Sequence, residues 1–289
     1  MRDNNRAVNR VFTRKVIGDL ITNGSNDLFD YVVRRYLDDL DNKTNGEVIS
    51  EIYAHLGDSN RNEYYYTNTL LNKLLVGIHS VNTTTALSQV RIEDHIADFV
   101  MINGEGKVYE IKSDLDNFDR LNDQLYDYFK AFSKVSVLAA EHERDHVEQV
   151  LSKLGEMGDA VGIYVLTEND TIFSKTSGRE PKEYNNNLNY KSIFKMLRKY
   201  EYENVIRHYY HEIPVVAPVF HFKACYEQFC QIPILEAQRL AFCELKKRNK
   251  ISKIAFESIP KELKSVVYFS NLSSKLSEIT NFLQRTYGR

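Results

Sequence analysis

Three ionisable residues lie inside short apolar runs of the sequence, where charge is costly. Asp98 interrupts the run from 96 to 102, and Glu110 and Lys112 belong to the run from 108 to 112. Burying an unpaired charge is expensive, so charges at these positions indicate a purpose. Two neighbouring carboxylates repel each other unless a cation lies between them, and carboxylate oxygens suit Mg²⁺. The pattern is compatible with a metal site beside a lysine, but the spacing alone is explained at least as well by a plain ion pair of Lys112 with Asp98 or Glu110.

The local sequence predicts how these side chains are brought together. Asn103-Gly104 is typical of a hairpin turn between two strands, at 96–102 and 108–112. Side chains alternate along a strand, so Glu110 and Lys112 share a face, and the hairpin places Asp98 beside Glu110. A metal held there would polarise a phosphate and help to generate hydroxide. Lys112 could position the attacking water or balance the developing negative charge.

The surrounding pattern predicts an α/β fold with a mixed central sheet. Strands are expected at 87–92, 96–102, 108–112, 134–140 and 160–166, with a short edge strand at 169–175. Helices are expected at 5–22, 26–40, 47–56, 62–76, 117–132 and 143–154, with Gly57 ending the third. The loop-rich stretch at 176–189 is the best boundary. We therefore predict an N-terminal helical region at 1–58, a core at 59–175, and a mainly helical C-terminal region at 176–289.

Asp98 followed by Glu110-Ile111-Lys112, with this order of strands, resembles the PD-(D/E)XK nuclease superfamily. The resemblance implies a restriction-endonuclease-like core flanked by helices, with the metal acid on the second strand and E-x-K on the third. It also implies that Asp98, Glu110 and the Ile111 carbonyl bind Mg²⁺ (or Mn²⁺), while Lys112 orients the water. One departure is Ala97, which stands where the family has proline.

The segment after E-x-K extends the resemblance. Arg120, Gln124 and Tyr128 are four residues apart and hence on one helix face. Gln124 and Tyr128 resemble the Q-x-x-x-Y signature of the RecB-like and phage-exonuclease branch, which implies that this face contacts substrate. The stretch 109–128 also resembles a small bacterial group of uncharacterised proteins in this superfamily.

Many members of the superfamily carry one more acid on the helix before the strands. The resemblance suggests Glu63 as this acid, because it lies near the start of the helix that precedes the strands, with Glu51 as the alternative. Stabilisation of the helix N-terminus would also explain a glutamate at position 63.

We therefore expect a metal-dependent nuclease, with DNA favoured over RNA, that serves defence against foreign DNA or repair. Two alternatives stay open at this stage. One is a non-catalytic nucleic-acid-binding or regulatory module with the same fold, and the other is an RNA-cleaving effector. A homodimer or a protein partner bound through the helical flanks is also compatible with the sequence.

Composition sets limits on partners and compartment. The 289 residues carry a formal net charge of −2, so a nucleic-acid binder of this composition needs local positive charge. The densest basic run, at 246–253, could supply phosphate contacts or be a solvated turn. An odd count of three cysteines argues against a disulfide framework, and no apolar run approaches a membrane span. We expect a cytoplasmic protein with no membrane partner.

Overall fold

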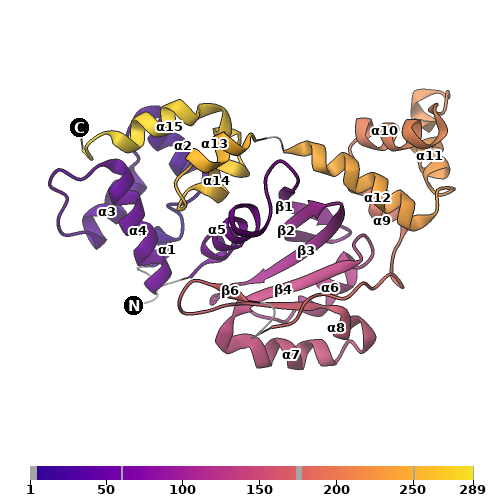
Figure 1. Ribbon diagram of the computed structural model, residues 1–289, viewed down its shortest axis with the longest axis horizontal. Helices are drawn as coiled ribbons and strands as arrows, with labels where there is room; N and C mark the ends of the chain where they lie inside the picture. The colour runs from indigo at the N-terminus through magenta and orange to yellow at the C-terminus, as the bar shows by residue number, and fades with distance from the viewer. Residues whose placement is uncertain (1–4, 60, 174–177, 250, 289) are drawn as a thin grey trace.

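A mixed sheet of six strands forms the centre of the protein, with helices on both faces (Figure 1). The computed structural model describes residues 5–59, 61–173, 178–249 and 251–288. Its strands follow the order of the chain: β1 (Thr85–Ile92), β2 (His95–Asn103), β3 (Glu105–Lys112), β4 (Lys134–Ala140), β5 (Gly162–Leu166) and β6 (Ile172–Phe173). The predicted α/β class, with a mixed sheet and helical N- and C-terminal regions, is confirmed.

The first three strands form an antiparallel meander, and the next two join it in parallel. Strand β2 pairs with both β1 and β3, whereas β3, β4 and β5 run parallel and β6 turns back on β5. The predicted hairpin is present, because Asn103 pairs with Glu105 around Gly104. Gly104 has φ +75°, a left-handed conformation that glycine adopts without a steric cost. The hairpin fixes the register between Asp98 and Glu110.

One face of the sheet packs on helices that follow the meander. Leu121, Leu125, Tyr128 and Phe129 belong to this core together with Val100 and Val108 from the strands. The helices of this core are α6 (Leu121–Tyr128), α7 (Arg144–Ser152), α8 (Glu156–Ala160), α9 (Tyr190–Lys195) and α12 (Ile234–Leu245), and α10 (Lys199–Tyr210) and α11 (Pro218–Phe229) pack on α9 and α12. Short 3₁₀ turns, η2 (Glu141–Glu143) and η3 (Lys246–Arg248), precede α7 and follow α12.

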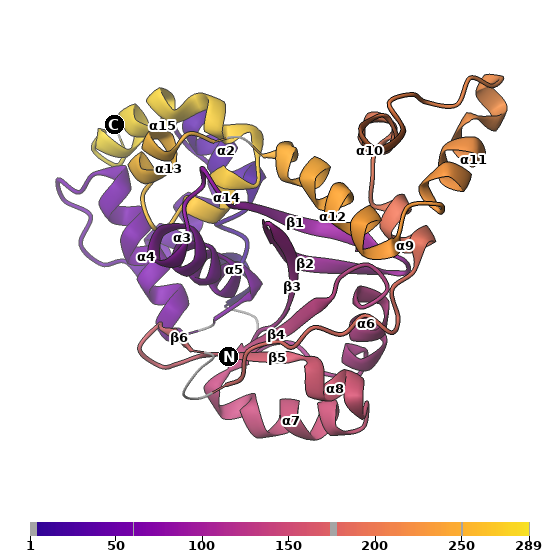
Figure 2. The same ribbon diagram turned by 45° about the vertical axis from the view of Figure 1, so that its right-hand side comes forward.

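The other face packs on helices from both ends of the chain. These are α1 (Asn5–Val8), α2 (Arg14–Asn23), α3 (Asp27–Tyr36), α4 (Asn45–Ser59), α5 (Glu63–Asn72), η1 (Lys73–Ile78), α13 (Lys253–Ser258), α14 (Lys264–Tyr268), η4 (Asn271–Lys275) and α15 (Leu276–Gln284). The N-terminal helices and α13–α15 lie side by side at one end of the molecule, and α10 and α11 project at the opposite end (Figures 1 and 2). The C-terminal third of the chain therefore covers both faces of the sheet.

Several predicted boundaries need correction. The expected helix at 5–22 is broken, because Arg10 and Val11 close turns onto Ala7 and Val8 before Thr13 caps α2. Gly57 does not end its helix, since α4 continues to Ser59. The helix expected at 117–132 spans only Leu121–Tyr128. The edge strand is limited to β6, and residues 174 and 175 of that prediction lie outside the described residues.

The helices of the described segments are short. None of them combines the length and the apolar character that crossing a membrane requires.

Candidate active site

The strand ladders open at one place, and Asp98 lies there. On one side, the described ladder of β1 and β2 pairs Ser88 with Phe99 and Val90 with Ala97, but it leaves out Gln89 and Asp98. On the other side, the ladder of β2 and β3 ends at Phe99 and Tyr109, one residue before Asp98 would face Glu110. The carboxylate of Asp98 bridges this gap, because its Oδ2 accepts the Ile111 backbone N–H at 2.9 Å.

Glu110 stands at the centre of a buried polar network. Lys112 Nζ donates to Glu110 Oε1 at 3.0 Å and to Gln124 Oε1 at 2.9 Å. Gln124 Nε2 donates to the same Glu110 oxygen at 2.5 Å, and the Tyr128 hydroxyl lies 2.7 Å from Glu110 Oε2. That hydroxyl also lies 2.9 Å from the Ile96 carbonyl, and its single proton can serve only one of the two acceptors at a time.

The burial of this network makes its pairing important. Glu110 is 2% exposed and Lys112 is 7% exposed, so each charge depends on the other. Burial raises the pKa of the Tyr128 hydroxyl far above its ordinary value, and the negative charge of Glu110 raises it further. Tyr128 is therefore protonated at neutral pH and acts as a donor. Glu110, Lys112, Gln124 and Tyr128 of the sequence pattern form one connected group of side chains, and Asp98 lies beside it through its bond to the Ile111 backbone.

Asp98 lies in an unfavourable electrostatic environment. Burial raises the pKa of its carboxyl to about 8, and repulsion from Glu110 and Glu63 contributes, against the opposing effects of the Ile111 N–H and Lys112. A positive charge at this position would lower that pKa, because it would stabilise the ionised carboxylate. The site therefore carries more negative charge than its own lysine compensates.

Glu63 faces the same site from the first residue of α5. It lines a hollow of about 560 Å³ together with Asp98 and Gln89, and Gln89 Nε2 donates weakly to Glu63 Oε1 at 3.4 Å. Partial burial raises the pKa of the Glu63 carboxyl, and the charges of Asp116 and Glu110 raise it further. The alternative acid, Glu51, is on α4 and does not line this hollow. Its Oε2 instead forms an ion pair with Lys43 Nζ at 2.9 Å.

The predicted substrate-contacting face of α6 divides into two parts. Gln124 and Tyr128 point to Glu110 and hold it, as described above, so their described contacts are within the protein. Arg120 is exposed at the N-cap of α6, and no described contact joins its side chain to this network. Whether these residues contact substrate stays a prediction.

Sequence reasoning missed Gln89. This residue has φ +54°, which is uncommon for a side chain of its kind, and it stands opposite Asp98 where the ladder of β1 and β2 opens. Such a conformation is retained when the surrounding structure enforces it, and it occurs often near functional sites. A glutamine within an apolar strand gives no signal of this in the sequence, because the signal lies in the register.

The donor groups fit a hard divalent cation. Among the described residues, no group of three or more His, Cys, Asp or Glu side chains forms a ready-made metal cluster. Mg²⁺ does not need one, since it binds through one or two carboxylates while water and substrate phosphate complete the shell. Glu110 uses about three of its four lone-pair positions for Lys112, Gln124 and Tyr128, which leaves one available. Asp98, Glu110 and the Ile111 carbonyl would hold the ion.

Tyr128→Phe is expected to destabilise the metal-free protein by about 1–2 kcal/mol, because a buried carboxylate loses a donor. Activity should fall less than on loss of either acid, since the ring still fills its place in the core. Urea unfolding of both proteins in EDTA measures the difference. Tyr126→Phe is the matched control, because Tyr126 is exposed on the same helix. An unchanged free energy of unfolding in Tyr128→Phe would contradict the hydrogen bond to Glu110.

Comparisons with known proteins gave one match. A model of the family described as bacteriophage P4 protein cII matches residues 57–275. The matched segment begins in α4 and ends in η4, so it contains the whole sheet and every residue of the site. A search of curated proteins found no match, and a search of solved structures found none.

Proposed function

The chain belongs to the bacteriophage P4 protein cII family, and we propose that it is a metal-dependent nuclease that hydrolyses phosphodiester bonds, in DNA rather than RNA. The observation that carries the proposal is that Asp98 and Glu110 lie close enough to repel each other where the ladders open. Glu110 is held there by Lys112, Gln124 and Tyr128. Two carboxylates, a lysine and a hollow beside them are the parts that this reaction needs.

A bound Mg²⁺ would polarise the phosphate and lower the pKa of water. The residues of the chain would do the rest. Asp98 would be ionised when it binds the ion, because a nearby positive charge reverses the rise in its pKa. The hydrogen bond that its carboxylate accepts from the Ile111 N–H fixes the direction in which that carboxylate points.

Lys112 is the residue we assign to the nucleophilic water. Its ammonium group is held between Glu110 and Gln124 at 3.0 and 2.9 Å, so its position is set by two acceptors. A third N–H is available to donate to water or to a phosphate oxygen. Fixed positive charge next to the reacting phosphate would stabilise the negative charge that develops on it.

Glu63 has a supporting role in this proposal. It shares the hollow with Asp98, and burial raises the pKa of its carboxyl, which makes it a better proton acceptor than an ordinary glutamate. Its attachment through Gln89 is weak, which leaves the side chain free to reorient.

The test uses the purified full chain with end-labelled DNA and RNA of several lengths, in Mg²⁺, in Mn²⁺ and in EDTA. We expect cleavage of DNA that requires the metal and disappears in Glu110→Gln. Asp123→Asn is the matched control, because Asp123 is exposed on α6 and should leave cleavage unchanged. Absence of cleavage in every arm would refute the proposal. Cleavage of RNA alone would favour the RNA-cleaving alternative, and binding without cleavage would favour the non-catalytic module.

A further inference from the structure

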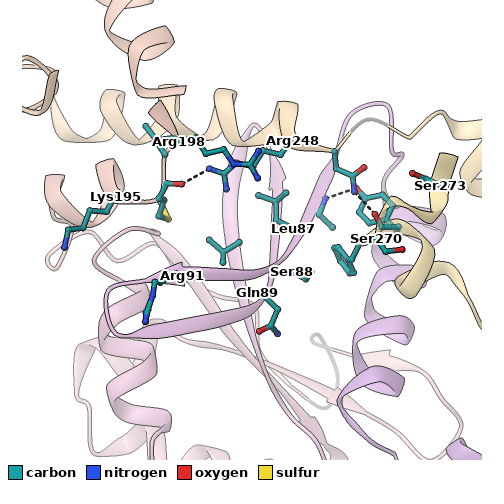
Figure 3. Close-up of a pocket in the computed structure, with 16 residues that line it drawn as sticks. Leu87, Ser88, Gln89, Arg91, Lys195, Arg198, Arg248, Ser270 and Ser273 are labelled. Atoms are coloured by element: carbon teal, nitrogen blue, oxygen red, sulfur yellow. Dashed lines mark hydrogen bonds between the residues drawn. The ribbon is translucent and has the colours of Figure 1, made fainter. Parts of the chain in front are cut away.

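A second hollow, of about 700 Å³, lies over the edge strand β1 beside the candidate site (Figure 3). Four cationic side chains line it: Arg91 from β1, Lys195 from the end of α9, Arg198 just before α10, and Arg248 from η3. Among the described residues that line it, none is acidic. In a chain with a formal net charge of −2, this is a local concentration of positive charge.

Three of these four cations are free to bind a ligand. Arg248 is occupied, because it donates to both carboxylate oxygens of the buried Glu201, at 2.7 and 2.5 Å, and to the Met196 carbonyl. Arg91, Lys195 and Arg198 are exposed, and none of them forms an ion pair with an acid of the described residues. The guanidinium of Arg198 makes one long hydrogen bond, of 3.5 Å, to the Tyr200 hydroxyl, which a phosphate can replace. The positive charge of the hollow is therefore uncompensated, and three long side chains can reach toward an anion.

This hollow is continuous with the one that contains Asp98 and Glu63. Ser88, Gln89, Phe269 and Ser270 line both of them. Gln89 stands opposite Asp98, and Arg91 is two residues further along β1, which corresponds to about 7 Å along an extended strand. A phosphodiester chain with one phosphate at Asp98 would therefore meet Arg91 with a neighbouring phosphate.

The hollow over β1 differs in charge from the other large hollow of the described structure. That hollow, of about 530 Å³, is lined by Asp58, Asp114, Glu141 and Glu168. It also contains Arg61, but the guanidinium of Arg61 is bonded to the Thr167 and Glu168 carbonyls and lies 3.2 Å from Asp170. A polyanion would be repelled there and attracted to the hollow over β1.

We propose that the hollow over β1 binds the phosphate backbone of the nucleic acid on one side of the cleavage point, through Arg91, Lys195 and Arg198. The inference rests on the proposed function for the identity of the reacting phosphate at Asp98. It goes beyond that function because it assigns a binding surface and a direction: the bound strand leaves the site along β1 toward α9.

The test is a binding measurement that does not depend on cleavage. Fluorescence anisotropy with labelled single-stranded and duplex DNA of equal length, in EDTA, compares wild type with the triple variant Arg91→Glu, Lys195→Glu, Arg198→Glu. The control replaces Lys153, Lys182 and Lys223 with Glu, which changes the net charge equally at exposed positions elsewhere. We call the triple variant of Arg91, Lys195 and Arg198 the groove variant. We expect it to lose at least about tenfold in affinity and the control to lose little.

The salt dependence gives a second readout. Three lost phosphate contacts should reduce the slope of log affinity against log salt by about 2 for a single strand and by about 3 for a duplex. The DNA form that loses more affinity in the groove variant is the form that the hollow binds. Equal affinities of the groove variant and the control for both forms would overturn the inference, and so would a wild-type protein that binds neither form.

Binding and cleavage can fail separately in these experiments. Groove-dependent binding by a protein that cleaves nothing would support this inference while refuting the proposed function. If the groove variant still cleaves and its affinity is unchanged, the proposed function is supported and this inference is refuted. Circular dichroism of each variant checks that the three exposed substitutions leave the fold intact.

Discussion

Asp98→Asn is expected to abolish metal-dependent cleavage and, at the same time, to make the metal-free protein more stable near pH 8. Loss of activity follows because an amide is a poor ligand for Mg²⁺ in comparison with a carboxylate. The gain in stability follows because the substitution removes a charge that burial disfavours and that Glu110 and Glu63 repel. The amide oxygen can still accept the Ile111 N–H, so the hydrogen bond at this position can persist.

The direction of the pH effect follows from the raised pKa of Asp98. In the folded protein the carboxyl titrates at about 8, against 3.8 for the ordinary side chain. Between these two values the folded state retains a proton that the unfolded state has released. The free energy of unfolding of the wild type should therefore decrease as pH rises through this window, and below it the carboxyl makes no difference. In Asp98→Asn this contribution is absent, so the stability curve should be flatter.

Urea unfolding in EDTA, near pH 5 and near pH 8, measures both effects. Near pH 8 we expect the variant to exceed the wild type by on the order of 1–3 kcal/mol, with a smaller difference near pH 5. Adding Mg²⁺ should stabilise the wild type near pH 8 and leave the variant almost unchanged, because a ligand stabilises only the state that binds it. Asp123→Asn is the matched control. An Asp98→Asn protein less stable than wild type near pH 8 would contradict the claim that burial and repulsion destabilise the charged Asp98.

The core of the site could be predicted from the sequence because local rules position it. Alternation along a strand places Glu110 and Lys112 together, and the Asn103-Gly104 turn fixes their register against Asp98. The four-residue spacing of Gln124 and Tyr128 places both on one face of α6, and the structure brings this face to Glu110. In each case the residues are close in sequence, so few alternative arrangements are compatible with the pattern.

Arg120 illustrates the limit of the same spacing rule. The helix begins one residue later, at Leu121, so Arg120 is at the N-cap with a different backbone conformation. Helix boundaries depend on capping and tertiary packing, which periodicity does not specify. The same reason explains the broken helix at 5–22 and the continuation of α4 past Gly57.

The hollow over β1 could not be predicted because its cations come from distant parts of the chain. Arg91 is about 100 residues away from Lys195 and Arg198 in the sequence, and only the fold brings the three to one hollow. The densest basic run, which the sequence does reveal, is partly neutralised instead. Arg248 pairs with Glu201, and Lys247 pairs with Glu244. Net local charge depends on which partners the fold supplies, and a count of basic residues does not include them.

Lys112→Met is expected to destabilise the metal-free protein, whereas Asp98→Asn stabilises it. Both variants are expected to lose cleavage activity. Removing one partner of a buried ion pair leaves an uncompensated charge, which costs about 3–5 kcal/mol. Here the cost arises because Glu110 would face Asp98 with no cation between them. Cleavage should be lost although Asp98 and Glu110 are intact. Lys112→Arg is the control that keeps the positive charge, and it should be less destabilising.

Comparing Asp98→Asn with Lys112→Met distinguishes a metal ligand from the residue that acts on water. If Asp98 and Glu110 hold the metal, then Mg²⁺ should still raise the melting temperature of Lys112→Met, whereas it should not raise that of Asp98→Asn. The double variant should be more stable than the sum of the single effects predicts, by at least about 1 kcal/mol, because the two residues carry interacting charges. Additive effects would show that Lys112 does not compensate Asp98. Absence of metal stabilisation in Lys112→Met would show that the lysine is needed to assemble the metal site itself.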